Sequence, residues 1–201
     1  MPRWGIPYGE RLLDLDAVFG RQARRVLDIG FGDGDALMSA AANYPELDYV
    51  GVEVHEPGIG HLLVLLQRGG LENVRIIDRD AVDVIEHMFP PTSFAAVKLL
   101  FPDPWPKKRH HKRRLIQPDF IASLAGILEP QGLLHIATDW SNYAEHTLEV
   151  LDESSCFEAI QPESLADPAL VFRAPTKFER RGRRLGHEVF DFYFSKCGSG
   201  T

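Results

Sequence analysis

Val26-Leu27-Asp28-Ile29-Gly30-Phe31-Gly32-Asp33-Gly34-Asp35 is the stretch of sequence that organises the rest of the chain. Its apolar start predicts a short buried strand, and its three glycines predict a sharp turn that opens into a helix. A nucleoside-like ligand binds well at such a junction, because glycine lets the backbone approach closely and the first helical turn has free N–H groups. The alternative is a glycine-rich turn in which Asp28 bonds only to local backbone.

The spacing of the glycines discriminates between kinds of ligand. Gly30, Gly32 and Gly34 form a G-x-G-x-G pattern, whereas dinucleotide-binding turns carry G-x-G-x-x-G. Asp28 precedes the first glycine by two residues, where a carboxylate repels a pyrophosphate and attracts a cation. The motif therefore favours the sulfonium amino acid of S-adenosylmethionine (SAM), and it counts against an NAD-dependent oxidoreductase.

Length, composition and charge limit the class of protein. The chain has 201 residues, of which 44% are hydrophobic, and this suits one α/β domain with a sizeable core. Its net charge is −7, yet six Lys/Arg residues crowd into residues 107–114. The two cysteines form no CxxC pair, the start is not signal-like, and no apolar run is long enough to span a bilayer. We therefore expect a cytoplasmic protein with free thiols and no membrane contact.

Strand and helix patterns alternate along the chain. Strands are expected over 25–29, 48–54, 73–78, 94–101, 132–137, 157–160 and 189–194. Helices are expected over 34–43, 56–68, 81–88, 118–128 and 140–153, with a short one within 10–19. Residues 102–114 and the stretch of about 27 residues before the last strand are expected to be loops. This order predicts an α/β doubly wound parallel sheet whose last pair of strands is antiparallel, because no helix pattern separates that pair.

Acidic residues lie at or just after the ends of the first three expected strands, on the side where open α/β sheets bind ligands. Asp28 belongs to the first strand, Glu53 to the second, and Asp80 follows the third. A carboxylate at Glu53 can accept both hydroxyls of a ribose, and one at Asp80 can accept the exocyclic amine of adenine. Each has a simpler alternative as a helix-capping residue. Together the three acids favour a cofactor with ribose, amines and positive charge over one with phosphates.

The loop after the fourth strand, Phe101-Pro102-Asp103-Pro104-Trp105-Pro106, is stiffened by prolines that fix φ and remove donors. It holds Asp103 beside Trp105, a pair that can grip and stack a flat base. The alternative is a stiff turn with Trp105 in the core.

A run of cations follows that loop directly. We expect it to bind several phosphates of a nucleic acid, with a solvated surface as the alternative. The expected contacts are Lys107, Lys108, Arg109, Lys112, Arg113 and Arg114. None of the eight histidines has metal-ligand spacing, so no metal is expected.

Two further segments carry candidate substrate contacts. Asp139 follows the fifth strand, and its carboxylate can accept from N1–H and the 2-amino group of a guanine or cap the next helix. Residues 174–184 combine five cations with Thr176 and Glu179, which suggests a second surface for phosphate and base, or a solvated loop.

In this order the motifs resemble the bacterial tRNA (guanine-N7-)-methyltransferase family. The resemblance covers the chain from about Gly20 to Phe194, and the proline-rich loop with its basic tail and Thr176-Lys-Phe-Glu are its most specific parts. The segments that carry it are Asp28–Gly34, Gly51–Gly58, Arg79–Val82, Phe101–His110, Ala137–Trp140 and Thr176–Gly182. Two features depart from the family. Asp28 stands where a glutamate is frequent, and the segment before the first strand is short and has fewer basic residues than in many relatives.

The resemblance implies the class I SAM-dependent methyltransferase fold over residues 25–201, with 1–24 as an N-terminal segment. It implies methyl transfer from SAM, with S-adenosylhomocysteine as product, to N7 of a guanine in the variable loop of tRNA, by a monomer or homodimer. The family's SAM-contacting acids fall on Asp28, Glu53, Asp80 and Asp103, beside Gly30, Gly32 and Gly34. Its substrate contacts fall on Lys107, Asp139, Thr176, Lys177, Phe178 and Glu179, and the expected methyl-transfer centre is formed by Asp103 and Asp139.

Other functions fit parts of the pattern. The Pro-Asp-Pro-Trp loop faintly resembles the aromatic-ended loops of enzymes that methylate exocyclic amines, so a SAM-dependent methyltransferase acting elsewhere on a structured RNA is the main alternative. A noncatalytic RNA-binding module is a third reading, and the intact acids at the strand ends argue against it.

Overall fold

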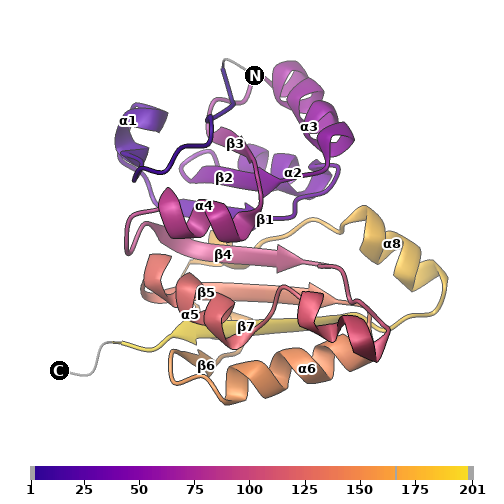
Figure 1. Cartoon of the computed structure of the whole chain (residues 1–201). Coiled ribbons are helices and arrows are strands. Elements are labelled where there is room, and N and C mark those ends of the chain that lie inside the picture. Colours follow the sequence, from indigo (N-terminus) through magenta and orange to yellow (C-terminus); the bar gives the residue numbers. More distant parts are fainter. Residues whose placement is uncertain (1–2, 166, 199–201) are drawn as a thin grey trace.

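The computed structural model describes residues 3–165 and 167–198, which form a seven-stranded sheet with helices on both faces (Figure 1). The strand order is β3-β2-β1-β4-β5-β7-β6. β1 to β5 run parallel, and β7 runs antiparallel to β5 and to β6. The strands are β1 (Arg25–Ile29), β2 (Asp48–Glu53), β3 (Val74–Asp78), β4 (Phe94–Leu100), β5 (Leu128–Thr138), β6 (Phe157–Ala159) and β7 (Phe190–Lys196). The expected class I methyltransferase fold, with its antiparallel last strand, is confirmed.

Helices cover both faces of this sheet. They are α1 (Leu15–Phe19), α2 (Asp35–Asn43), α3 (Glu56–Gly69), α4 (Ala81–His87), α5 (Pro118–Ile127), α6 (Ser141–Asp152), α7 (Pro168–Val171) and α8 (Lys177–Arg184), with 3-10 helices η1 (Lys108–Arg113) and η2 (Pro162–Ser164). The prediction of two long loops is therefore wrong in part. Residues 102–114 contain η1, and the stretch before the last strand contains η2, α7 and α8. α8 has almost no apolar residues, so hydrophobic periodicity could not indicate it.

The core is divided between the two faces because successive strand residues point to opposite sides. In β1, Leu27 packs in a cluster with Ile121 and Leu124 of α5, whereas Val26 packs in a second cluster with Leu62 of α3. These four leucine and isoleucine side chains and Val26 are fully buried. The parallel strands are thus covered on both sides, which explains why their sequences are nearly continuously apolar.

The first described residues protect one edge of the sheet. The N–H of Ile6 donates to the carbonyl of Ile76 in β3 at 2.8 Å, and the N–H of Ile76 donates to the carbonyl of Trp4 at 2.8 Å. Trp4 is buried, and its indole N–H donates to the carbonyl of Leu71 at 2.9 Å. An exposed edge strand would offer unpaired backbone to other chains, and this segment covers it. The division of the chain at residue 24 stays a prediction.

The carboxyl ends of the parallel strands all face one side of the molecule, and α8 lies on that side (Figure 1). None of the helices in residues 3–165 and 167–198 is long and apolar enough to cross a membrane.

Candidate functional site

The glycine turn forms as expected between β1 and α2. Gly30, Gly32 and Gly34 have φ angles of 71°, 60° and 78°, in the left-handed region that favours glycine. A Cβ on Gly34 would also lie 2.7 Å from the Cβ of Leu62, so α3 packs directly on the turn. α2 begins at Asp35, immediately after the last of these glycines. The strand–turn–helix arrangement predicted from this stretch is confirmed.

Glu53 at the end of β2 ties that strand to the glycine turn. Its Oε2 accepts from the N–H of Gly32 at 2.8 Å, and its Oε1 accepts from the N–H groups of Val54 and His55 at 2.8 and 3.0 Å. These two residues precede α3, whose N-cap residue is His55, so the alternative in which Glu53 caps that helix is wrong. The same side chain lines a cavity of about 140 Å³. Glu53 therefore orients the turn and faces the space in which we expect the nucleoside.

Asp80 lines the same cavity from the start of α4. It is the N-cap residue of that helix, and its Oδ1 accepts from the N–H of Val82 at 2.8 Å. The helix-cap interpretation is therefore confirmed for this oxygen. Leu115 and Val54 supply apolar walls to the cavity, so a flat base with an amine directed at Asp80 matches its lining.

Asp28 is buried beside Lys98, a residue that the sequence patterns did not single out. The two lie side by side on β1 and β4, and they are 4% and 3% exposed. Burial raises the pKa of Asp28 to about 6, against the opposing effect of Lys98, and burial lowers the pKa of Lys98 to about 8. Oδ1 of Asp28 has no hydrogen-bond partner among the described residues. A buried carboxylate with an unpartnered oxygen at the glycine turn fits the cationic amino-acid end of SAM.

The proline-rich loop continues β4 and then turns sharply. The N–H of Phe101 donates to the carbonyl of Ala137 at 2.8 Å, and Phe101 and Trp105 have φ angles of 57° and 42°. The Trp105 ring packs edge-on against His110, and the guanidinium of Arg113 lies 5.1 Å from its centre. The core alternative for Trp105 is therefore wrong, since the ring contacts η1. Asp103 is exposed beside it.

The six cations of the basic run differ in their exposure to solvent. Five of its cations are exposed on or beside η1, namely Lys107, Lys108, Arg109, Lys112 and Arg113. Arg114 is 3% exposed, and it donates to the carbonyl of Pro104 at 3.0 Å and to Oδ1 of Asn142 at 2.7 Å. The prediction that Arg114 binds phosphate does not match this position, because the side chain is buried and its Nε and Nη2 hold the proline-rich loop against α6.

α8 carries the Thr176-Lys-Phe-Glu motif at its start. Thr176 is its N-cap residue, and the hydroxyl accepts from the N–H of Glu179 at 3.1 Å. Glu179 is 2% exposed, and its two carboxylate oxygens pair with Arg173 and Arg183. The expected contact of Glu179 with tRNA does not match this arrangement, because the carboxylate is buried and both of its oxygens pair with arginines of the protein. Lys177 and Phe178 are exposed, as their predicted role requires.

α8 packs between the glycine turn and the loop after β5. A Cβ on Gly32 would lie 3.7 Å from the ring of Phe178, and one on Gly182 would lie 2.6 Å from Oδ2 of Asp139. Oδ2 of Asp139 also lies 3.3 Å from Nδ1 of His187. Asp139 does not cap α6, whose N-cap residue is Trp140. The helix-cap alternative is wrong for Asp139, and α8 joins this residue to the cofactor turn.

Four polar side chains that the sequence motifs do not include link the sheet to the segment that leads into α8. They are Lys98, His135, Arg173 and Asp191, and only the first two gave a signal, as single polar residues within the apolar runs 94–100 and 133–137. His135 is fully buried and hydrogen-bonds Asp191 at 2.8 Å. Burial lowers the pKa of His135, so the neutral ring donates from Nε2. Although burial acts against it, hydrogen bonds from His135 and Arg173 lower the pKa of Asp191 to about 2.

The structure thus brings Asp28, Glu53, Asp80 and Asp139 to the expected side of the sheet. Asp103 lies in the exposed loop that follows β4. Within residues 3–165 and 167–198, no group of three or more His, Cys, Asp or Glu side chains is arranged to hold a metal ion.

Comparisons with known proteins agree with this geometry. A family model described as "Putative methyltransferase" matches residues 22–192. The tRNA (guanine-N(7)-)-methyltransferase of Halorhodospira halophila is 52% identical over 195 residues, which cover 96% of this chain and 84% of that protein. The protein of the same name from Burkholderia vietnamiensis is 54% identical over 195 residues, covering 97% and 76%. The solved structure of an rRNA methylase from Streptococcus thermophilus has a TM-score of 0.58 at 17% identity, covers 87% of both chains, and shares the fold.

Proposed function

We propose that this chain, which belongs to the tRNA (guanine-N(7)-)-methyltransferase family, transfers the methyl group of SAM to N7 of a guanine in tRNA. The observation that carries this proposal is the position of α8, which contacts the glycine turn at Phe178 and Asp139 at Gly182. A cofactor site and a candidate base-binding carboxylate are thereby joined by one helix. The variable loop is the position in tRNA that we propose for this guanine.

The cofactor-binding roles follow from the surroundings of each acid. Asp28 is the partner we propose for the cationic amino-acid end, because its buried Oδ1 lacks a protein donor. Glu53 would accept the ribose hydroxyls and Asp80 the amine of adenine, since both line one cavity. Asp103 would meet the cofactor near the methyl group from the proline-rich loop. Bound here, SAM supplies an electrophilic methyl group on a positively charged sulfur.

The chain's contribution to the chemical step is alignment. N7 of guanine has an in-plane lone pair and no proton to lose, so it can form the new N–C bond as the C–S bond breaks, without a general base. The rate then depends on holding N7, the methyl carbon and sulfur in line. Asp139 would accept from N1–H and the 2-amino group, and its negative charge would offset the positive charge that develops on the guanine. Methyl transfer leaves a cationic 7-methylguanine and neutral S-adenosylhomocysteine.

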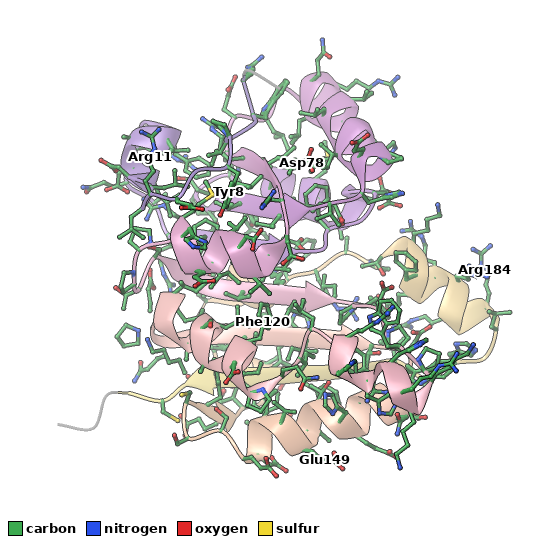
Figure 2. The ribbon with its side chains drawn as sticks, viewed as in Figure 1. Tyr8, Arg11, Asp78, Phe120, Glu149 and Arg184 are labelled. Carbon is green, nitrogen blue, oxygen red and sulfur yellow. The ribbon has the colours of Figure 1, made fainter. Side chains whose placement is uncertain are left out.

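The tRNA surface that we propose combines η1 with the outer face of α8. The five exposed cations of residues 107–113 lie in one patch, and α8 adds Lys177, Arg180, Arg181, Arg183 and Arg184 on its exposed side. Figure 2 shows Arg184 at the outer end of α8, directed away from the sheet. Cations that bind phosphates supply affinity that falls with salt concentration, independent of base identity. Thr176 and the two residues that follow it would contact the tRNA where this surface meets the glycine turn.

The test is an incubation of purified protein with labelled SAM and unmodified tRNA, followed by nucleoside analysis. We expect label in 7-methylguanosine and cleavage mapping that places it in the variable loop. Asp139→Asn should lower kcat about 100-fold while SAM binding stays unchanged, whereas the surface control Asp152→Asn on α6 should behave as wild type. Label in an exocyclic N-methylguanosine would contradict the proposed position. Recovery of Asp139→Asn activity at raised pH would instead show that a general base is needed.

The cytoplasmic location stays a prediction from the tRNA substrate that we propose. The monomer or homodimer state also stays a prediction, and sedimentation of the protein with and without tRNA would settle it.

A further inference from the structure

We infer that Arg173 is a positioning residue for methyl transfer, which holds α8, and through α8 the tRNA-contacting residues and Asp139, in register with the cofactor turn. This inference rests on the proposed function. It concerns a side chain that lies outside the glycine turn, the proline-rich loop, the basic run and the Thr176-Lys-Phe-Glu motif.

Arg173 contacts three separate segments at once. Its Nε and Nη2 donate to the two carboxylate oxygens of Asp191 in β7, at 3.0 and 2.6 Å, and its Nη1 donates to Glu179 of α8. The guanidinium carbon also lies 5.9 Å from the ring centre of Phe101, where the proline-rich loop begins. Only 11% of the side chain is exposed. The planar fork of an arginine is the group that can bind one carboxylate with two parallel hydrogen bonds and still reach a second.

The partners of Arg173 are themselves fixed to the central sheet. Asp191 receives a further hydrogen bond from the buried His135 of β5, at 2.8 Å. The residue before Arg173 is held too, because Nζ of the buried Lys98 in β4 donates to the carbonyl of Phe172. The chain that leads into α8 is therefore attached at two consecutive residues to strands that form the core. A site that is supported by rigid strands is held more precisely than one on a free loop.

The orientation of α8 matters because its inner face carries the contacts of the site. Glu179 and Gly182 are the buried residues of this helix, and Phe178 lies next to Glu179. Gly182 lets Asp139 approach so closely that a Cβ there would lie 2.6 Å from its Oδ2. Releasing Glu179 from Arg173 would let the helix shift relative to both the glycine turn and Asp139. A displacement of about 1 Å between reacting groups can lower a rate about 100-fold.

Arg183 provides a matched comparison. It also pairs with Glu179, at 2.7 Å, but its side chain is 66% exposed and it lies one helical turn away on the same helix. Because solvent surrounds the guanidinium of Arg183, its pairing with Glu179 is screened and contributes less to positioning than that of Arg173, and its charge is available to tRNA. Arg173 should thus act through geometry, and Arg183 should act through charge.

The experiment compares Arg173→Met, Arg173→Lys and Arg183→Met in the full-length protein. We expect Arg173→Met to lower kcat at saturating tRNA about 10- to 100-fold, with the Kd for SAM within about twofold of wild type and the salt slope of tRNA binding unchanged. Arg173→Lys should recover only part of kcat, because an ammonium cannot form the bidentate pair. Arg183→Met should lower the salt slope by about 1 with a smaller effect on kcat.

Hydrogen exchange supplies a readout that does not depend on the acceptor. We expect Arg173→Met and Arg173→Lys to accelerate amide exchange in 176–184 and to leave β1 and α2 unchanged. Unchanged kcat together with unchanged exchange in α8 would overturn the inference. Parallel loss of SAM binding and of protection throughout the sheet would also overturn it, because Arg173 would then serve only global stability. A wild-type protein that methylates another nucleoside would overturn the proposed function instead, and exchange in α8 would still test the role of Arg173.

Discussion

The two halves of the site are built in different ways. On the cofactor side, the contacts join neighbouring turns, such as Glu53 to the backbone of Gly32 and Asp80 to that of Val82. On the substrate side, the contacts join one side chain to another, such as Arg173 to Asp191 and Asp139 to His187. The first half depends on backbone geometry and the second on ion pairs between side chains. We therefore expect the cofactor side to be sensitive to steric changes and, at the buried Asp28, to pH, whereas the substrate side should be sensitive to charge, salt and pH.

The largest effect is expected from crowding the glycine turn. A Cβ on Gly58 of α3 would lie 2.0 Å from the carbonyl oxygen of Gly32, so Gly58→Ala should destabilise the protein by about 3 kcal/mol and abolish SAM binding. Gly60 on the same helix has nothing within 4 Å of its Cβ position. Gly60→Ala should therefore stabilise the helix by about 0.5–1 kcal/mol. Chemical denaturation and calorimetric titration with SAM measure both. Equal behaviour of the two variants would contradict the steric account.

Acid should weaken the substrate side through Asp191. Its pKa is lowered to about 2, so the stability that it contributes is complete above its ordinary pKa near 4 and is lost as the pH falls from about 4 to 2. The shift corresponds to about 2 kcal/mol. Denaturation curves at a series of pH values should show this loss in wild type, and Asp191→Asn should be less stable at neutral pH but flatter between pH 4 and 2. A wild-type profile that is flat in this window would count against the network around Arg173.

Cofactor binding should weaken in mild acid through Asp28. Its pKa is raised to about 6, so the carboxylate becomes neutral below that pH and loses its attraction for the cationic end of SAM. The Kd for SAM should therefore rise about tenfold between pH 7.5 and 5. Asp28→Asn should bind weakly at every pH and show no transition near 6. Isothermal titration at each pH tests this, and a Kd that does not change with pH in wild type would exclude Asp28 as the partner of the cation.

The smallest effect is expected from removing two cations of the basic run. Lys107→Ala combined with Arg109→Ala should weaken tRNA binding several-fold and reduce the salt slope by about 2, with unchanged affinity for SAM. Arg68→Ala combined with Arg11→Ala, two exposed cations outside the basic run, is the charge-matched control and should leave both unchanged. Filter binding over a series of salt concentrations provides the measurement. Loss of SAM affinity in the double variant would show that this segment belongs to the cofactor site.

Local chemistry explains what could be predicted before the structure. The turn after β1 needs glycines at positive φ, and the acids at the ends of β2 and β3 follow apolar strands with clear boundaries, so residue type and spacing indicated both. Hydrophobic periodicity could not predict α8, because its stability comes from the Thr176 cap and from ion pairs rather than from an apolar face; the Thr176-x-x-Glu179 spacing is the local signal for its start. η1 likewise has no buried residue to produce a periodic pattern.

Residue type alone also cannot predict which of two adjacent residues of equal charge is buried. Arg113 and Arg114 are adjacent in the basic run, yet the first is exposed and the second is buried against Asn142, a residue 28 positions away. Glu179 shows the same limit, because it is buried against Arg173, which links it to Asp191 of β7. The order of apolar strands, glycines and acids along the chain was enough for the fold and for the position of the acids at the strand ends, since strand boundaries and the glycine turn depend on local residue type. The geometry of the substrate side could not be predicted from the sequence, because it comes from pairs of side chains that only the packing of the sheet brings together.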